Sequence, residues 1–244
     1  MDIRKVIWFT VLILAACQTN TPSAQPALPP EIWQVQFSPT LQWIEPGLNL
    51  CSNRQANIGL VTFERPPAEL DVHPADITLR WGAPEHLNGH AAVLAYDDLA
   101  LVVNAHNPIQ TLNQTDVQAI YEGKITNWKV FNPSPSFDQQ IQAWRYSDGE
   151  ETQQIFKNEL VKDLQNIEAA GIAPSPEYMV QIIAANVGAI GYIPQRWLNQ
   201  SIRKVSLLGN STNSMQVPIL AITNSEPTSQ QKLWLACLQS TLMP

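Results

Sequence analysis

The sequence predicts an α/β protein made of two lobes, each an open sheet, joined by two crossings of the chain. Short apolar segments rich in β-branched residues alternate along it with capped, amphipathic segments, as strands alternate with helices. Two long strand-like passages, 91–104 and 217–224, bracket the middle of the chain. At 244 residues and 45% hydrophobic content, the chain can form one large domain or two smaller ones.

The charge balance limits the kinds of partner that the protein can bind. The chain has 14 Lys and Arg against 21 Asp and Glu, a net charge of −7, and its basic residues do not cluster. Because a phosphate backbone needs a basic face, we expect no nucleic-acid partner.

The N-terminus has the features of an export signal. A short basic start, MDIRK, precedes an apolar run that is too short for a comfortable membrane span. The run ends in LAAC, which resembles the bacterial lipoprotein processing box, so we expect 1–16 to be a signal peptide and Cys17 to carry lipid. The alternative is an uncleaved anchor. If Cys17 carries lipid, residues 17–31 are the lipidated cysteine and a disordered, proline-rich tether. We then expect the protein to be exported and lipid-anchored to the outer side of the bacterial cell membrane, or in the periplasm.

Two cysteines remain after Cys17. Outside the cytoplasmic membrane Cys51 and Cys237 can form a disulfide. The alternative is two buried free thiols, since free cysteine packs as a small hydrophobe.

The first strand–helix unit begins at 33–37, where WQVQF alternates, and continues into a helix opened by Ser38 as N-cap and Pro39 at the first helical position. Further strands and helices are predicted from the hydrophobic period, from helix-capping residues and from turn residues. We expect strands at 57–63, 76–81, 91–104, 140–145, 188–193 and 217–223, and helices at 111–123, 150–162, 175–186 and 229–240.

Two motifs in the middle of the chain carry a resemblance. They are VVNAHNPIQTLNQTDVQAIYEGKITNWKVF and NVGAIGYIP. Both resemble the phosphate-type periplasmic solute-binding proteins of ABC transporters, over residues 95–195. Before residue 90 and after residue 200 the match is faint.

The resemblance implies a two-lobed periplasmic binding protein-like fold that closes on a solute by hinge motion. Lobe I would comprise 32–103 plus 201–244, and lobe II 104–200. Trp128 and Tyr192 of the motifs are expected in the core rather than at the ligand. The implied partners are a small-molecule solute and an ABC transporter permease.

The resemblance and the tendency of ligands to bind at strand ends and helix N-termini together suggest candidate ligand contacts. Ser38 and Thr40 open the first helix; the alternative for Ser38 is a plain N-cap. Asp76 and Arg80 match a family strand that leads to an arginine, although the serine usual before that arginine is absent. Asp97 is expected in the hinge strand rather than at the ligand.

A further group of contacts lies at a helix start. There the family has an arginine followed by Gly-Ser-Gly-Thr-Arg, and this chain departs from it by placing Glu150 and Glu151 where small residues are usual. A like charge at about 4 Å costs about 4 kcal/mol near a surface, or about a thousandfold in affinity, which disfavours phosphate. The alternative is that both are ordinary first-turn acids. The candidate contacts here are Arg145, Ser147, Gly149 and Thr152.

The sequence gives little support for a metal site or an enzyme active site. Of the histidines His73, His86, His90 and His106, the middle two are four apart, but Asn88-Gly89 between them indicates a turn. The sequence has no nucleophile elbow and no phosphate-binding loop with lysine. We therefore expect no metal, no cofactor and no enzyme activity.

Two functions remain. The first is a solute-capture lipoprotein serving an ABC importer, for an anion or another small solute, with phosphate disfavoured. The second is a binding-fold lipoprotein that acts outside transport, as a sensor or an assembly partner at the membrane surface.

Overall fold

The computed structural model describes residues 29–55, 57–131, 137–161, 167–208 and 215–243. The predicted signal peptide, Cys17 and most of the predicted tether lie outside the described residues. Within the described ranges, no helix has both the length and the apolar content that a membrane span requires.

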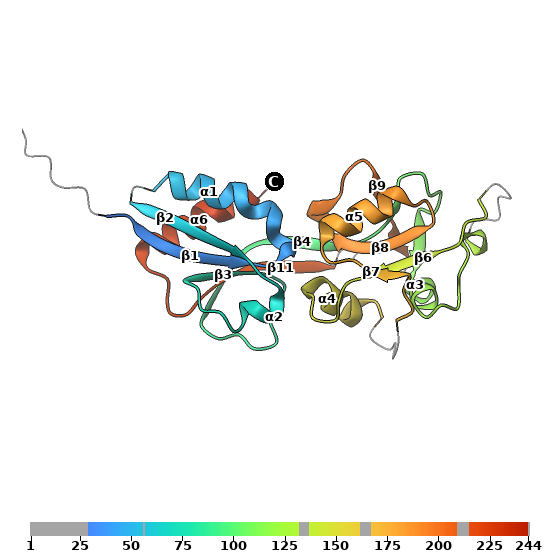
Figure 1. The fold of residues 1–244 in the computed structure, drawn as a ribbon, viewed down its shortest axis with the longest axis horizontal. Coiled ribbons are helices and arrows are strands. Elements are labelled where there is room, and N and C mark those ends of the chain that lie inside the picture. Colours follow the sequence, from blue (N-terminus) through green and yellow to red (C-terminus); the bar gives the residue numbers. More distant parts are fainter. Residues whose placement is uncertain (1–28, 56, 132–136, 162–166, 209–214, 244) are drawn as a thin grey trace, which may run out of the picture.

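The architecture centres on β4 (His90–Asn104), the longest strand, which links two parts of an elongated molecule (Figure 1). Most described strands form one nine-stranded sheet. Its order is β2 (Ile58–Glu64), β1 (Glu31–Phe37), β3 (Ile77–Trp81), β11 (Gln216–Thr223), β4, β8 (Ala189–Pro194), β6 (Gln142–Arg145) and β7 (Gly171–Ile172), with β9 (Ile202–Lys204) also on β4. Strands β5 (Thr111–Asn113) and β10 (Ser206–Leu208) form a separate pair. Residues 90–98 of β4 pair with β11, whereas 99–104 pair with β8 and β9. Strands and helices alternate as expected, so the predicted α/β fold is confirmed.

We call the part around β11 the first half. Its parallel strands β1, β2 and β3 are joined to β4 through β11, which runs antiparallel to both neighbours. Its helices α1 and α6 lie together on one face of the sheet (Figure 1). The elements are β1 (Glu31–Phe37), η1 (Pro39–Ile44), α1 (Glu45–Asn53), β2 (Ile58–Glu64), α2 (Pro67–Leu70), β3 (Ile77–Trp81), β11 (Gln216–Thr223) and α6 (Ser229–Leu242).

We call the part around β8 the second half. Its strand β8 pairs antiparallel with β4 and parallel with β6, and α4 and α5 pack against β8. The elements are β5 (Thr111–Asn113), α3 (Gln114–Tyr121), η2 (Trp128–Val130), β6 (Gln142–Arg145), α4 (Glu151–Glu159), β7 (Gly171–Ile172), α5 (Pro176–Ala185), β8 (Ala189–Pro194), η3 (Gln195–Trp197), β9 (Ile202–Lys204) and β10 (Ser206–Leu208).

The predicted first helix differs from the observed one at its start. It begins as the 3-10 segment η1, and the α-helix α1 follows from Glu45. Pro46 explains the break, because proline has no N–H to donate to the preceding turn and is tolerated only in the first turn of an α-helix.

Trp128 and Tyr192 lie in the core, as predicted. Both are fully buried, and Trp128 Nε1 donates to the carbonyl of Gly188, which joins the two sequence motifs at 2.9 Å. Tyr192 stacks on Phe156 of α4, with ring centroids 3.7 Å apart. This stacking fixes α4 against the sheet of the second half.

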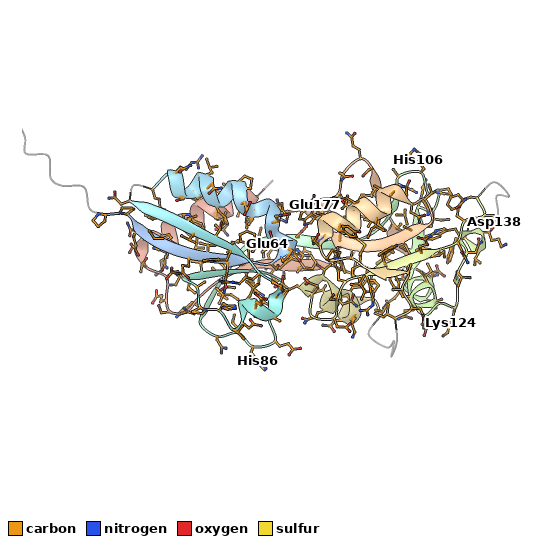
Figure 2. The ribbon with its side chains drawn as sticks, in the orientation of Figure 1. Glu64, His86, His106, Lys124, Asp138 and Glu177 are labelled. Carbon is orange, nitrogen blue, oxygen red and sulfur yellow. A yellow bond between two sulfur atoms is a disulfide. The ribbon has the colours of Figure 1, made fainter. Side chains whose placement is uncertain are left out.

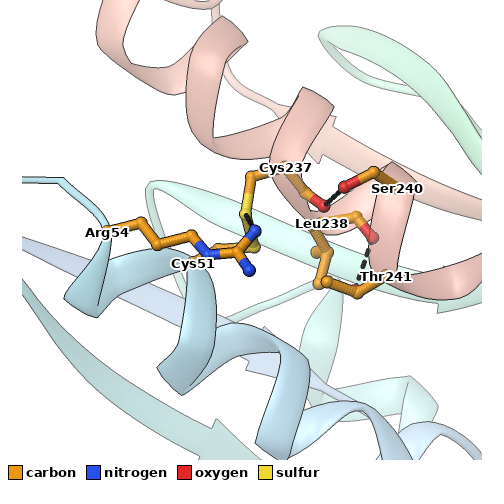
Figure 3. Close-up of a disulfide and its surroundings, with 6 residues drawn as sticks. All are labelled: Cys51, Arg54, Cys237, Leu238, Ser240 and Thr241. Carbon is orange, nitrogen blue, oxygen red and sulfur yellow. Dashed lines mark hydrogen bonds between the residues drawn. A yellow bond between two sulfur atoms is a disulfide. The ribbon is translucent and has the colours of Figure 1, made fainter.

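The Cys51–Cys237 disulfide is present (Figure 3). It joins α1 to α6 across 186 residues of sequence, both within the first half. The alternative of two free thiols is therefore wrong.

Residues 202–208 bear on the predicted lobe boundary. Strand β9 pairs with the end of β4, and β10 pairs with β5, so both lie with the second half, although the second segment of the predicted lobe I, 201–244, included them. The division into two moving lobes stays a prediction.

Candidate functional site

The side chain of Glu151 lies between the two halves. Glu151 is the first residue of α4, in the second half, and only 5% of it is exposed. Its carboxylate is surrounded by donors of the first half: Ser38 Oγ donates at 2.7 Å, Arg80 Nε at 2.5 Å and the Trp81 amide at 3.4 Å. We call these three donors the carboxylate seat.

Ser38 has a role that differs from an N-cap. It occupies the N-cap position of η1, yet its side chain makes no capping hydrogen bond. Its hydroxyl is fully buried and donates to Glu151 instead. The plain-cap interpretation of Ser38 is therefore wrong.

Arg80 is placed in the seat by β3. The residues from Leu79 to Trp81 are all buried, and the Arg80 guanidinium is held between two acids. Its Nη1 donates to Asp71 at 2.7 Å while its Nε donates to Glu151. A charge buried in this way needs such partners, and Asp71, with a side chain 61% exposed, supplies the solvent-facing one.

Gly82 lies where α4 meets the first half. The chain turns there with φ +98°, in the left-handed region that glycine tolerates. An added Cβ would lie 2.9 Å from the Ile155 side chain of α4. Gly82 thus provides the turn after β3 and leaves room for the tip of the Ile155 side chain.

A second set of contacts lies beside the seat. Thr40 Oγ1 and Thr152 Oγ1 are 3.5 Å apart, and both residues are buried. The carbonyl of Thr40 accepts from Trp197 Nε1 of η3 at 3.0 Å. The two halves are therefore held together by neutral hydrogen bonds as well as by the ion pair.

Burial sets the electrostatics of the two glutamates. Desolvation raises the pKa of Glu151, and this effect is opposed by Arg80, by the Ser38 hydroxyl and by the Trp81 amide. The pKa of Glu150 is raised to about 7, first by burial and then by the charge of Glu151. The two neighbours thus differ: Glu151 is paired with donors, while Glu150 is next to a like charge.

The structure brings together four of the eight predicted ligand contacts: Ser38, Thr40, Arg80 and Thr152. Asp76 lies elsewhere, where its carboxylate accepts from the amide of Gln34 at 2.7 Å. Asp97 accepts from Trp81 Nε1 at 3.2 Å in the linking strand β4. Whether any of these residues binds a solute stays a prediction.

The predicted contacts that precede α4 also lie apart from the seat. Arg145 donates to the carbonyl of Tyr146 and to Asp148. Ser147 and Gly149 are exposed, and nothing lies within 4 Å of a Cβ added at Gly149, so no close approach requires glycine there.

Sequence reasoning missed the direction of Glu151. It left open that both glutamates were ordinary first-turn acids, and for Glu151 that interpretation is wrong. The available signal was Ile155, four residues later, because residues i and i+4 share one face of a helix. An apolar residue on that face indicates that it packs inward.

A pocket of about 540 Å³ has Arg80 in its lining. It is lined by residues of the first half together with Gln154 of α4, so it also lies between the halves. Its polar lining includes Asp71, His73, Glu85 and His86. Over the ranges that the structure covers, no three residues among His, Cys, Asp and Glu are placed to hold a metal ion.

Comparisons with known proteins agree with the fold. Residues 85–240 match the family described as PBP superfamily domain, whereas no curated protein matches the sequence. The fold is similar to that of a Clostridium perfringens protein assigned as a phosphate ABC transporter substrate-binding protein, solved with bound phosphate. For that pair the TM-score is 0.73 and the identity 19%, over 85% of this chain and 93% of the other.

Two further structures are similar. An ABC-type phosphate transport receptor from Vibrio cholerae has a TM-score of 0.63 at 22% identity, over 86% of this chain and 93% of that one. The regulatory domain of an OxyR2 variant from Vibrio vulnificus also has a TM-score of 0.63, at 16% identity over 88% and 98%. At these identities the likeness shows the fold alone, which these binding proteins and the regulatory domain share.

Proposed function

This chain belongs to the family described as PBP superfamily domain. We propose that it is an exported, lipid-anchored binding protein that works outside phosphate uptake. Its role would be that of a sensor or an assembly partner at the membrane surface. It is a binding protein rather than an enzyme, and it needs no cofactor. Its anchor is the lipid on Cys17, which holds it on the outer side of the bacterial cell membrane or in the periplasm.

The observation that carries this proposal is the position of Glu151. A free phosphate competing for the Ser38 and Arg80 donors would meet a buried carboxylate that already accepts from both. A phosphate at about 4 Å from that carboxylate loses about 4 kcal/mol. The protein can therefore have the fold of a solute-binding protein without binding phosphate.

The range of proteins with this fold supports a role outside transport. One similar structure is a regulatory domain, that of OxyR2 from Vibrio vulnificus. The same architecture therefore occurs in a protein that regulates, and a tethered form at the membrane surface is compatible with such a role.

A second candidate function is solute capture for an ABC importer, with a solute other than free phosphate. The pocket beside Arg80 favours it, since a polar solute there would contact the first half and Gln154 of α4 together. The permease of such an importer would be the partner.

Calorimetry tests the proposal. Phosphate is titrated into the purified full-length protein, held in detergent micelles, at constant ionic strength. We expect no binding up to millimolar phosphate. Binding in the micromolar range would overturn the proposal and favour an uptake role. A thermal-shift screen of amino acids, other anions and cations then tests the second candidate, because a ligand that binds only the folded state raises Tm.

A further inference from the structure

We propose that Glu151 is a built-in ligand: its carboxylate occupies a latent site for small oxyanions and carboxylates, and thereby holds the two halves together without any solute. This inference deepens the proposed function and rests on it, because it states what occupies the site and what keeps the molecule closed.

The seat has the chemistry of an anion site. It combines a guanidinium, a hydroxyl and a backbone amide, which are three kinds of donor that bind carboxylates and phosphates. Ser38 is fully buried and Arg80 is 6% exposed, so the donors are fixed and shielded from water. Hydrogen bonds to an ionised group in such surroundings are stronger than those to a neutral one.

The occupant comes from the opposite half of the molecule. All three donors belong to the first half, near the ends of β1 and β3, whereas Glu151 belongs to α4 of the second half. A carboxylate attached to one half and bound by the other closes the interface as a solute would. Because it is covalently attached, its effective concentration at the seat is high, and a free anion must compete with it.

Like charges oppose this closed arrangement elsewhere. Glu64 ends β2 in the first half, and Glu177 is in the first turn of α5 in the second half, and both lie near the middle of the molecule (Figure 2). Burial raises the pKa of Glu64, and the charges of Glu45 and Glu177 add to that effect. The contact between Glu151 and the seat acts against this repulsion across the interface, together with the neutral contacts of Thr40, and its loss should weaken the closed arrangement.

The test removes the carboxylate and supplies a free one. In Glu151→Ala, the Arg80 and Ser38 donors lose their shared acceptor, so we expect Tm to fall. Sodium acetate or sodium phosphate at millimolar concentration should restore most of the loss, while sodium chloride at equal ionic strength should not. By calorimetry, phosphate should bind Glu151→Ala at least about a hundredfold more tightly than wild type.

Glu150→Ala is the matched control. Glu150 is the neighbouring acid of the same turn, and its side chain forms no capping bond with α4. We expect neither anion to shift the Tm of Glu150→Ala beyond the effect of sodium chloride. An equal gain of anion binding in Glu150→Ala would overturn the proposal, because it would show that net charge and not the seat controls binding.

The outcomes distinguish a failure of the built-in ligand from a failure of the proposed function. A folded Glu151→Ala protein, verified by circular dichroism, that gains no affinity for either anion would overturn the built-in ligand while leaving the proposed function intact. Tight phosphate binding by the unmodified protein would instead overturn the proposed function. If Glu151→Ala does not fold, Glu151→Gln keeps the size of the side chain and replaces the anion by an amide. It should weaken the interface without gaining anion binding, and unchanged stability of this variant would contradict the proposal.

Discussion

Glu151 Oε1 lies 2.5 Å from Arg80 Nε, and both side chains are more than nine-tenths buried. This ion pair joins a helix of one half to a strand of the other. In the proposal above, it stands where a free anion would otherwise contact the arginine. Several measurable properties depend on this one contact.

Breaking the ion pair from one side should be costly. Arg80→Met leaves the Glu151 carboxylate buried without its cation, and Glu151→Leu leaves Arg80 with Asp71 alone. We expect each change to lower the free energy of unfolding by about 3–5 kcal/mol, whereas the double variant should lose less than the sum. Urea denaturation of the three variants measures this.

The exposed pair Lys232 and Glu226 is a control for this measurement. Its atoms are 2.7 Å apart, but both side chains are more than half exposed. Lys232→Met should cost no more than about 1 kcal/mol. A comparable small loss in Arg80→Met would contradict the assignment of the buried pair.

The stability should depend on pH through Glu150. Its pKa in the folded state is about 7, against an ordinary value of 4.5, because of burial and the Glu151 charge. Between these values the folded state binds more protons than the unfolded state, so the free energy of unfolding falls as the pH rises from about 4.5 to about 7.

Glu150→Gln should make the profile flatter over this window. The charged or titratable groups that interact with Glu150 are Glu151 and the buried phenol of Tyr146. Because burial raises the pKa of Tyr146 well above its ordinary value, the phenol stays neutral in this window. Urea denaturation at intervals across the window measures the slope. Part of the slope should persist, because burial also raises the pKa of Glu151 and of Glu64, but an unchanged slope in Glu150→Gln would contradict the assignment to Glu150.

The disulfide should stabilise the first half. Because it closes a loop of 186 residues, the chain-entropy model assigns it nominally about 5 kcal/mol. We expect Cys51→Ala/Cys237→Ala to unfold at lower urea concentration than wild type. Intact mass before and after reduction provides the direct check, and two free thiols in the exported protein would contradict the bond.

Lipidation at Cys17 is predicted from the sequence alone. Cys17→Ala should move the protein from the membrane fraction to the soluble fraction, because one lipid-bearing residue is the expected anchor. Fractionation followed by immunoblotting checks this, and unchanged membrane retention would argue for an uncleaved apolar anchor.

The sequence predicted the longer elements because their patterns are distinct. Strand β4 is long and apolar, and α6 begins with a capping box at Thr228. The strands β5, β9 and β10 have three residues each, which is too few for a recognisable period. Their pairing is decided by tertiary contacts that local sequence does not encode.

The site was predicted in part, for a similar reason. The resemblance, together with the tendency of ligands to bind at strand ends and helix starts, pointed to Ser38, Thr40, Arg80 and Thr152. The structure brings these residues together, and their binding of a solute stays a prediction. The role of Glu151 was not found, because a glutamate in a first turn stabilises a helix whether it faces solvent or the core. Only the packing of α4 against the first half decides between the two.

Small-angle X-ray scattering tests the central claim, that Glu151 takes the place of a solute in closing the molecule. We expect wild type to have the same radius of gyration with and without millimolar phosphate, because its seat is already filled. Glu151→Ala should have a larger radius alone and return to the wild-type value in acetate or phosphate. Compaction of wild type on addition of phosphate, or an unchanged radius in folded Glu151→Ala, would contradict the account.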